Sequence, residues 1–435
     1  MHKFHYVIVV SDHNLAELRS CRYWHKKEAL LSLSLIITQR MEKPATRLTH
    51  ELRKLQLPLE MVELRGNTFK GETLENDISP WIENTLLPSL RALNDAPCVL
   101  NYTGGTKQLA LALIMAHTWS HLHYQPYVEG QSLIEIMQPE SGQYKFTEHI
   151  DLHQEELSPL EFANLYFDAV EQLPAPAEML WLDPGQKPLY TERLTQETQR
   201  GTPWFFLIQC LENLFKGNAE THCAWPQDCS TPKLKALINR LLQDVTANPP
   251  LRHDTDGLHW NPRHPQAKSW KKWIAGQWFE QWVADYLLER LQLPHSMLVS
   301  NVKLGNEARN GADNRENSFL QALKLESNTQ IAGQRESDII LAYNQRFLAV
   351  ECKADIHKGQ AVAQWEEQLS SWAKDHGKIQ LMIATTPLAR IHMGEQRFNA
   401  FVRRCLSVRV VLWVVGQNDE AALKYALGKL PVISG

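Results

Sequence analysis

Short apolar runs alternate with longer amphipathic stretches from Lys3 to about Gln154. The strand-like runs are Tyr6–Val10, Leu30–Thr38, Leu59–Leu64 and Pro97–Tyr102. Apolar residues recur at helical spacing over Pro44–Leu55, Ile78–Leu93 and Gln108–Ser120. This alternation predicts an α/β unit with a mostly parallel sheet, in which the loops after the strands meet at one edge. Open sheets of this kind bind their ligands at that edge.

The same alternation returns after Trp260 and predicts a second α/β domain. Its expected strands are Met297–Leu304, Arg335–Tyr343, Phe347–Lys353, Ile379–Thr385 and Val408–Val415. Its expected helices lie near residues 276–291, 360–374, 392–405 and 418–428. Proline-rich breaks bound a middle segment with helical patterns over Trp204–Phe215 and Lys233–Val245. The sequence therefore predicts an α/β domain at 1–155, a mainly helical connector at 156–265, with a winged-helix module as the alternative, and a second α/β domain at 266–435.

Composition narrows the class of protein. The longest apolar stretches, such as Val408–Val415, are far shorter than the roughly 18 residues that a membrane-spanning helix needs, and the N-terminus lacks the layout of a secretory signal. Seven cysteines, an odd number in a chain of 435 residues, indicate reduced thiols. We therefore expect a cytoplasmic protein without a membrane partner.

The charge balance bears on nucleic-acid binding. A formal net charge of −4 gives no global attraction to phosphates, so a surface that follows a nucleic-acid backbone must be a local basic patch. Lys268–Lys272 and Arg403-Arg404 are the candidates. Four tryptophans crowd one stretch, and their spacing favours a packed helix face over base stacking; they are Trp270, Trp273, Trp278 and Trp282.

Two of the expected strands flank Asn344-Gln345, which suits a tight hairpin turn. If these two residues form the loop, residues whose numbers sum to the same value as 343 and 346 face each other. Asp338 then lies opposite Glu351, and Glu336 lies opposite Lys353. Because side chains alternate along a strand, all four share one face.

Carboxylates held about 4.5 to 5.5 Å apart repel each other unless a positive charge lies between them. A divalent cation is the natural occupant, and carboxylate oxygens suit Mg²⁺ or Mn²⁺, with the backbone carbonyl of Cys352 as a further ligand. Lys353 would orient water or neutralise charge on a phosphate. Glu280, among bulky apolar residues on an expected helix, is the expected helical partner. The alternative is a surface ion-pair ladder in which Glu336 pairs with Lys353.

A helix glutamate, a strand aspartate and Glu351-Cys352-Lys353 in this order resemble the restriction-endonuclease-like superfamily with its PD-(D/E)xK signature. The resemblance covers about Trp270 to Gly435 and implies metal-dependent hydrolysis of phosphodiester bonds. The candidate catalytic residues are Asp338, Glu351, Lys353, Glu280 and Glu336. The candidate metal ligands are Asp338, Glu351, Glu280 and the backbone carbonyl of Cys352.

Thr103-Gly104-Gly105-Thr106-Lys107 stands between an expected strand and an expected helix. Backbone N–H groups at a helix N-terminus, with a lysine beside them, form an anion site. The spacing is not that of a Walker motif. We expect a phosphorylated small ligand here, and a tight turn with a capping threonine is the alternative.

This turn, with a first strand that ends in Val9-Val10-Ser11-Asp12-His13-Asn14, resembles the CARF domain of CRISPR-associated proteins. Joined to a PD-(D/E)xK domain, it resembles the ancillary nucleases of the Card and Can type, which cyclic tetra-adenylate from type III CRISPR systems activates. The resemblance implies a Rossmann-like CARF domain, a homodimer that binds cyclic oligoadenylate on its two-fold axis, and a DNA or RNA substrate. The candidate ligand-binding residues are Ser11, Asp12, His13, Asn14, Thr103, Gly104, Gly105, Thr106 and Lys107.

Two other functions stay open. In one, a CARF sensor drives a DNA-binding middle segment as a transcription regulator, which gives the carboxylates and the lysine no role. In the other, the chain is an ungated restriction or repair nuclease, which gives the TGGTK turn no role.

Overall fold

The computed structural model describes residues 3–55, 60–65, 78–93, 96–126, 133–152, 155–167, 169–173, 187–215, 221–227, 230–242, 249–305, 335–343, 346–354, 379–407 and 409–428. The chain divides into two compact units. The first unit comprises Met1–Glu171 and Leu304–Arg335, and the second comprises Gln172–Lys303 and Glu336–Gly435. The finer domain boundaries expected at 155 and 265 stay predictions.

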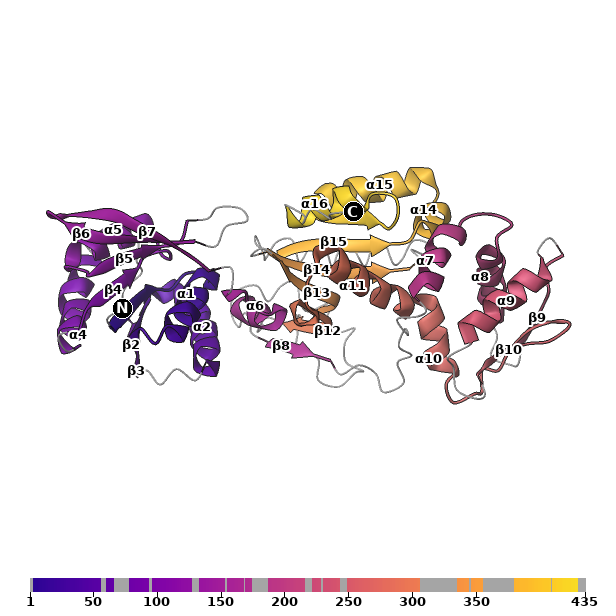
Figure 1. Cartoon of the computed structure of the whole chain (residues 1–435), viewed down its shortest axis with the longest axis horizontal. Helices are drawn as coiled ribbons and strands as arrows, with labels where there is room; N and C mark the ends of the chain where they lie inside the picture. The colour runs from indigo at the N-terminus through magenta and orange to yellow at the C-terminus, as the bar shows by residue number, and fades with distance from the viewer. Residues whose placement is uncertain are drawn as a thin grey trace, which may run out of the picture. The chain divides into compact units, whose positions relative to one another are not determined.

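The first unit is built on a seven-stranded sheet of order β3-β2-β1-β4-β5-β6-β7 (Figure 1). Its strands are β1 Phe4–Val9, β2 Leu30–Ile37, β3 Glu60–Arg65, β4 Cys98–Asn101, β5 His121–Tyr124, β6 Leu133–Glu140 and β7 Gln143–Asp151. β1 to β5 run parallel, and β6 and β7 add an antiparallel edge. The strand order reverses between β1 and β4, because β1 pairs with β2 on one side and with β4 on the other. Such a switch point is where open α/β sheets bind ligands.

Helices pack on this sheet, and α6 packs on the helix α2. They are α1 Leu15–Lys26, α2 Glu42–Lys54, α3 Ser79–Trp81, the π-helical turn η3 Ile82–Leu86, α4 Leu87–Ala92, α5 Lys107–Ala116 and α6 Pro159–Tyr166. Apolar side chains of this group, such as Leu86 and Leu109, pack with Val7 and Leu100 of the sheet. The expected strands and helices of this unit are present, but α1, β5, the β6–β7 hairpin and α6 were not expected.

The second unit contains a six-stranded sheet of order β16-β15-β14-β13-β12-β8. Its strands are β8 Ala169–Gln172, which lies at the boundary between the units, β12 Leu298–Gly305, β13 Arg335–Tyr343, β14 Arg346–Lys353, β15 Ile379–Thr385 and β16 Val410–Val414. β13 and β14 are antiparallel, whereas β14, β15 and β16 run parallel. Its helices include α11 Trp278–Leu291, α14 Leu388–Met393, α15 Glu395–Ser407 and α16 Asp419–Leu427. The helix expected near 360–374 lies outside the described residues.

The middle of the chain is not only helical. It holds α7 Lys187–Gln196, α8 Pro203–Leu214, α9 Thr231–Leu242, α10 Ala267–Lys272 and a π-helical turn, η6 Trp273–Gln277. It also holds an antiparallel sheet of order β10-β11-β9, with β9 Thr221–Ala224, β10 Leu251–His253 and β11 Gly257–Trp260. The four clustered tryptophans are each at most 5% exposed, which confirms a packed helix face.

The expected fold class is confirmed, with α/β architecture at both ends of the chain and a helical connector that carries a small sheet of its own. Among the described residues, every helix is too short or too polar to cross a membrane.

Candidate functional sites

The β13–β14 hairpin has the register that the sequence predicts. Tyr343 pairs with Arg346, and the pairing continues to Ile339 opposite Val350. Asp338 and Glu351 are the next residues outward on the two strands. The turn residues 344 and 345 lie outside the described residues, but the register fits a two-residue connection.

Asp338, Glu351 and Lys353 lie together at the end of this hairpin. The Lys353 ammonium contacts Glu351 Oε1 and lies 3.8 Å from Asp338 Oδ2. The three side chains are partly exposed, Asp338 the least at 15%. Burial alone would lower the pKa of Lys353, but the two carboxylates outweigh burial and raise it. Lys353 therefore stays charged at neutral pH.

Cys352 points the opposite way, into the hydrophobic core, while its backbone N–H donates to Asp338 Oδ2 at 2.7 Å. This hydrogen bond fixes the orientation of the Asp338 carboxylate. Burial raises the pKa of the Cys352 thiol well above its ordinary value, and the negative charges of Asp338, Glu280 and Glu351 raise it further. Glu280 is therefore within electrostatic reach of β14 from α11, which packs against that strand. Glu336 belongs to β13, and its side chain is not among those described.

Buried hydroxyl groups hold the ends of these strands, and no sequence pattern marked them. Lys353 pairs with Thr385 of β15. The hydroxyl of Thr386, which is fully buried, donates to Ala354 O at 2.5 Å and accepts the N–H of Leu388 at 3.3 Å. On β13, Ser337 Oγ donates to Ile339 O at 3.0 Å. The Thr386 hydroxyl thus fixes the backbone next to Lys353 at the end of β14, and the Ser337 hydroxyl fixes the backbone next to Asp338 on β13.

The oxygen donors here fit a hard divalent cation. Asp338 and Glu351 already share one positive charge, the Lys353 ammonium, so their placement suits a cation between them. In the part of the chain that the structure describes, no three His, Cys, Asp or Glu side chains are grouped closely enough to hold a metal. A cation at this place would need further ligands, such as the Cys352 backbone carbonyl or water. Oxygen-rich ligands of this kind select Mg²⁺ or Mn²⁺.

The TGGTK turn follows β4 and packs directly on the end of β1. A Cβ atom on Gly104 would lie 2.2 Å from Val9 O and 3.1 Å from Ser11 Cβ, so only glycine allows this approach. Gly105 has a φ of +83°, and a Cβ there would meet Val9 Cγ1 at 2.7 Å. Both glycines are therefore required, and they bring the turn against the first loop.

Helix α5 begins at the turn. Thr106 caps it by accepting the Leu109 N–H at 3.2 Å, so the capping-threonine interpretation is correct for its hydroxyl. Gly105, Thr106 and Lys107 are exposed. The first N–H groups of α5 and the Lys107 ammonium therefore favour negative charge at the switch point.

The first loop combines buried and exposed candidates. Asn14 is fully buried; its Oδ1 accepts the Ser11 N–H at 3.0 Å and its Nδ2 donates to Pro44 O at 3.2 Å. Ser11 Oγ accepts the His13 N–H at 3.3 Å. Asn14 therefore shapes the loop, whereas Asp12 and His13 are exposed, and the His13 ring lies 5.6 Å from the Tyr166 ring of α6.

A buried polar network supports the turn from below, and the sequence did not reveal it. Asn101 Oδ1 accepts the Thr103 N–H at 3.0 Å, and Asn101 Nδ2 donates to Tyr6 OH at 3.1 Å. Thr103 Oγ1 in turn accepts the Gln125 N–H at 2.9 Å. Thr103 thus links the ends of β4 and β5. Tyr102, which precedes it, stacks on Tyr124, and burial raises the pKa of Tyr102 to about 12.

No protein-family model and no curated protein matches this sequence. Among solved structures, Can2 from Sulfobacillus thermosulfidooxidans in complex with cyclic tetra-adenylate is 15% identical, with a TM-score of 0.59 over 96% of this chain and 95% of that chain. Protein VC1899 from Vibrio cholerae is 13% identical, with a TM-score of 0.60 over 98% and 99%. The chain therefore shares the mixed α/β fold of these two proteins over nearly its whole length.

Proposed function

We propose that this protein is a metal-dependent nuclease that a cyclic oligoadenylate switches on, as part of type III CRISPR defence. The observation that carries this proposal is the cluster of Asp338, Glu351 and Lys353 at the end of the β13–β14 hairpin. The Lys353 ammonium offsets the repulsion between the two carboxylates, and the group keeps one net negative charge that a bound cation would neutralise. A transcription regulator would have no use for them.

Each residue of the cluster has a defined role in this proposal. Asp338, Glu351 and Glu280 would hold Mg²⁺ or Mn²⁺ together with the Cys352 carbonyl, and Glu336 would be a further catalytic carboxylate. The metal, when bound, supplies an activated water and positive charge at the phosphate. The Cys352 N–H keeps Asp338 oriented. Lys353 places a permanent positive charge where a scissile phosphate develops negative charge.

We assign the sensor to the first unit. The Can2 structure contains cyclic tetra-adenylate, and this chain shares its fold. At the switch point between β1 and β4, the positive end of the α5 helix dipole and the exposed Lys107 favour an anion. Ser11 packs against Gly104 of the turn, and the exposed Asp12 and His13 follow it in the first loop.

The sensor would act as a homodimer, so that one cyclic ligand meets each motif twice. Two exposed apolar side chains on α5 support this part of the proposal. Leu111 is 56% exposed and Met115 is 78% exposed, and their i, i+4 spacing puts them on one face of the helix that begins at the turn. Exposed apolar side chains on one helix face can pack against the same face of a second copy.

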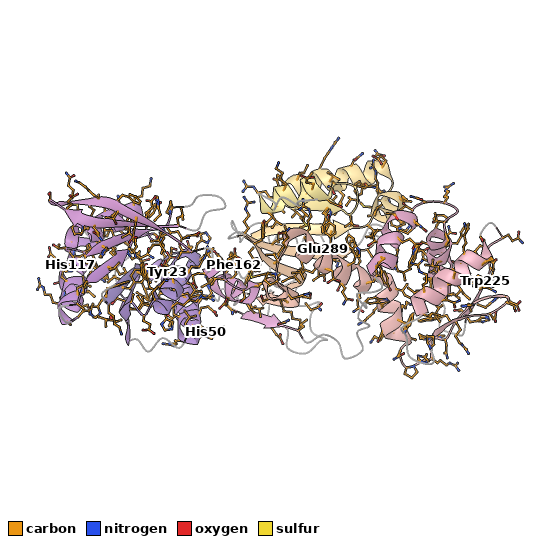
Figure 2. The ribbon with its side chains drawn as sticks, in the orientation of Figure 1. Tyr23, His50, His117, Phe162, Trp225 and Glu289 are labelled. Atoms are coloured by element: carbon orange, nitrogen blue, oxygen red, sulfur yellow. The ribbon has the colours of Figure 1, made fainter. Side chains whose placement is uncertain are left out.

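Cleavage measured in Mg²⁺ and in Mn²⁺, with and without cyclic tetra-adenylate, tests the proposal on DNA and RNA substrates. Glu351→Gln and Lys353→Met should each reduce cleavage by about 10²-fold or more, because each removes charge stabilisation in the transition state. Glu289→Gln is the matched control, since Glu289 is exposed on α11 (Figure 2) and should keep full activity. Metal-dependent cleavage that survives in Glu351→Gln would exclude this active site.

A further inference from the structure

Positive charge is concentrated on two helices of the middle segment that the proposed function does not use. α9 (TPKLKALINRLL) and α10 (AKSWKK) together carry six lysines and arginines and no acidic residue. The whole chain has 45 basic and 49 acidic residues, so this stretch departs sharply from the average.

The charged side chains of α9 face outward. Its inner face is apolar and buried, and it consists of Leu234, Leu237, Ile238 and Leu241. Its outer face exposes Lys233, Ala236 and Arg240. Arg240 also pairs with Glu192 at 3.1 Å, but both side chains are partly exposed, and such pairs open at little cost.

Neighbouring residues hold α9 in place, and among the described residues Lys233, Ala236 and Arg240 stay exposed. The Lys235 ammonium lies 5.2 Å from the centre of the Trp225 ring, which Figure 2 labels beside α9. His253 Nε2 hydrogen-bonds to Asn239 Oδ1 at 2.7 Å, which ties the helix to the β10–β11 hairpin. The order β10-β11-β9, with the hairpin directly after α9, is that of a winged helix, although no short helix lies between β9 and α9 in the described part of the chain.

This segment is joined to the candidate active site by a single hydrophobic core. The core contains Leu207 of α8 and Leu237 of α9, Trp270 of α10, Trp278 of α11 and Cys352 of β14. Because protein interiors are close-packed, α9 keeps a fixed position relative to the β13–β14 hairpin. A nucleic acid held on α9 would therefore be held in a defined place relative to Lys353.

We propose that α9 enters the major groove of a B-form DNA duplex while lysines of α10 contact phosphates. The surface therefore selects duplex DNA as the substrate class, a conclusion that rests on the proposed nuclease function. Ala236, small and exposed between Lys233 and Arg240, lets the helix approach the groove floor, and the flanking cations meet the two backbones. The major groove of an A-form duplex is too deep and narrow to admit a helix, so duplex RNA does not fit.

Binding is measured with the full chain in EDTA, by fluorescence anisotropy on a labelled DNA duplex of about three helical turns. The same measurement uses single-stranded RNA and duplex RNA, with and without cyclic tetra-adenylate. Because metal is absent, cleavage does not enter the result.

Ala236→Leu should weaken duplex-DNA binding about tenfold without changing charge. Lys233→Gln/Lys268→Gln/Lys272→Gln should weaken it further and lower the slope of log K against log salt by about 0.9 for each phosphate that the variant no longer neutralises.

Lys424→Gln, an exposed lysine on α16 of the same unit, is the matched control and should bind like the parent chain. Lys271 is left unchanged, because it donates to Phe215 O at 2.8 Å and supports the fold. The proposal is overturned if the parent fails to bind duplex DNA in both conditions, prefers either RNA, or is unaffected by Ala236→Leu. If duplex binding follows the prediction but no metal-dependent cleavage is found, the active-site proposal fails and the docking surface stands.

Discussion

At the scale of single residues, the sequence predicts which side chains share one face of a strand pair, because side chains alternate between the two faces of a strand. Counting outward from a two-residue turn places Asp338, Glu351 and Lys353 on one face, and the observed register starts from the same pair. Glu280 is harder to place, because its position depends on how α11 is rotated against the sheet. Buried polar residues such as Asn101 cannot be found in this way, since their partners come from distant strands and helices.

His123 illustrates a residue whose burial has a measurable consequence. It is fully buried against Trp24 and Tyr6, and burial, assisted by His121, lowers its pKa to about 3. The unfolded chain therefore binds one more proton than the folded chain between pH 3 and 6.5, and stability falls as pH falls through this window.

We expect His123→Phe to remove this part of the pH dependence. The parent should lose up to about 1.4 kcal/mol for each pH unit below the ordinary histidine value, and the variant should lose correspondingly less. Urea unfolding between pH 7 and pH 4 measures the difference. His50→Phe is the control, because His50 is exposed on α2 (Figure 2). A difference between parent and His123→Phe that does not vary with pH would contradict the assignment.

At the scale of elements, strong alternation of apolar runs predicted most strands and helices, whereas the β6–β7 hairpin and the short strands of the middle segment were missed. The β10–β11 hairpin carries a signal that could have found it: Asp254 starts the turn, and its Oδ1 accepts the N–H groups of Asp256 and Gly257 at 2.7 and 3.0 Å. Its strands are only a few residues long, so their pairing depends on β9 and on packing against α8. α1 was missed because buried polar residues, including Glu17 and Arg19, interrupt its apolar pattern.

The contact between α7 and the start of α11 depends on a buried cation. Arg193 pairs with Glu197 at 3.0 Å, and its guanidinium lies 4.1 Å from the centre of the Trp278 ring. Arg193→Met should destabilise the second unit by about 3 to 5 kcal/mol, because it leaves the carboxylate of Glu197 buried without its cation. Thermal unfolding measures the loss, and Arg193→Met/Glu197→Met should recover much of it.

The exposed Arg390–Glu395 pair supplies the control, and Arg390→Met should change stability little. If the double variant is no more stable than Arg193→Met, packing rather than charge explains the loss.

At the scale of the whole molecule, the two candidate sites lie in separate compact units. The sequence predicted both α/β regions because each repeats the same strand and helix periods. These periods do not show how binding in one unit affects chemistry in the other. Such coupling is a difference in ligand affinity between two states of the whole protein. The proposed gating therefore has to be tested by a change confined to the sensor.

Lys107 allows such a change, because its exposed side chain lies at the start of α5 in the first unit, while Lys353 lies in the second. Lys107→Ala should weaken binding of cyclic tetra-adenylate by removing one charge-assisted contact, on the order of tenfold. A variant that only binds more weakly should reach full cleavage at higher activator concentration, whereas a variant that has lost coupling should not.

Titration of cyclic tetra-adenylate against cleavage separates the two outcomes. Lys43→Ala is the control, because Lys43 is exposed on α2. If the parent cleaves equally fast without any cyclic oligonucleotide, the chain is an ungated nuclease; if Lys107→Ala leaves the activation curve unmoved, the TGGTK turn is not the sensor.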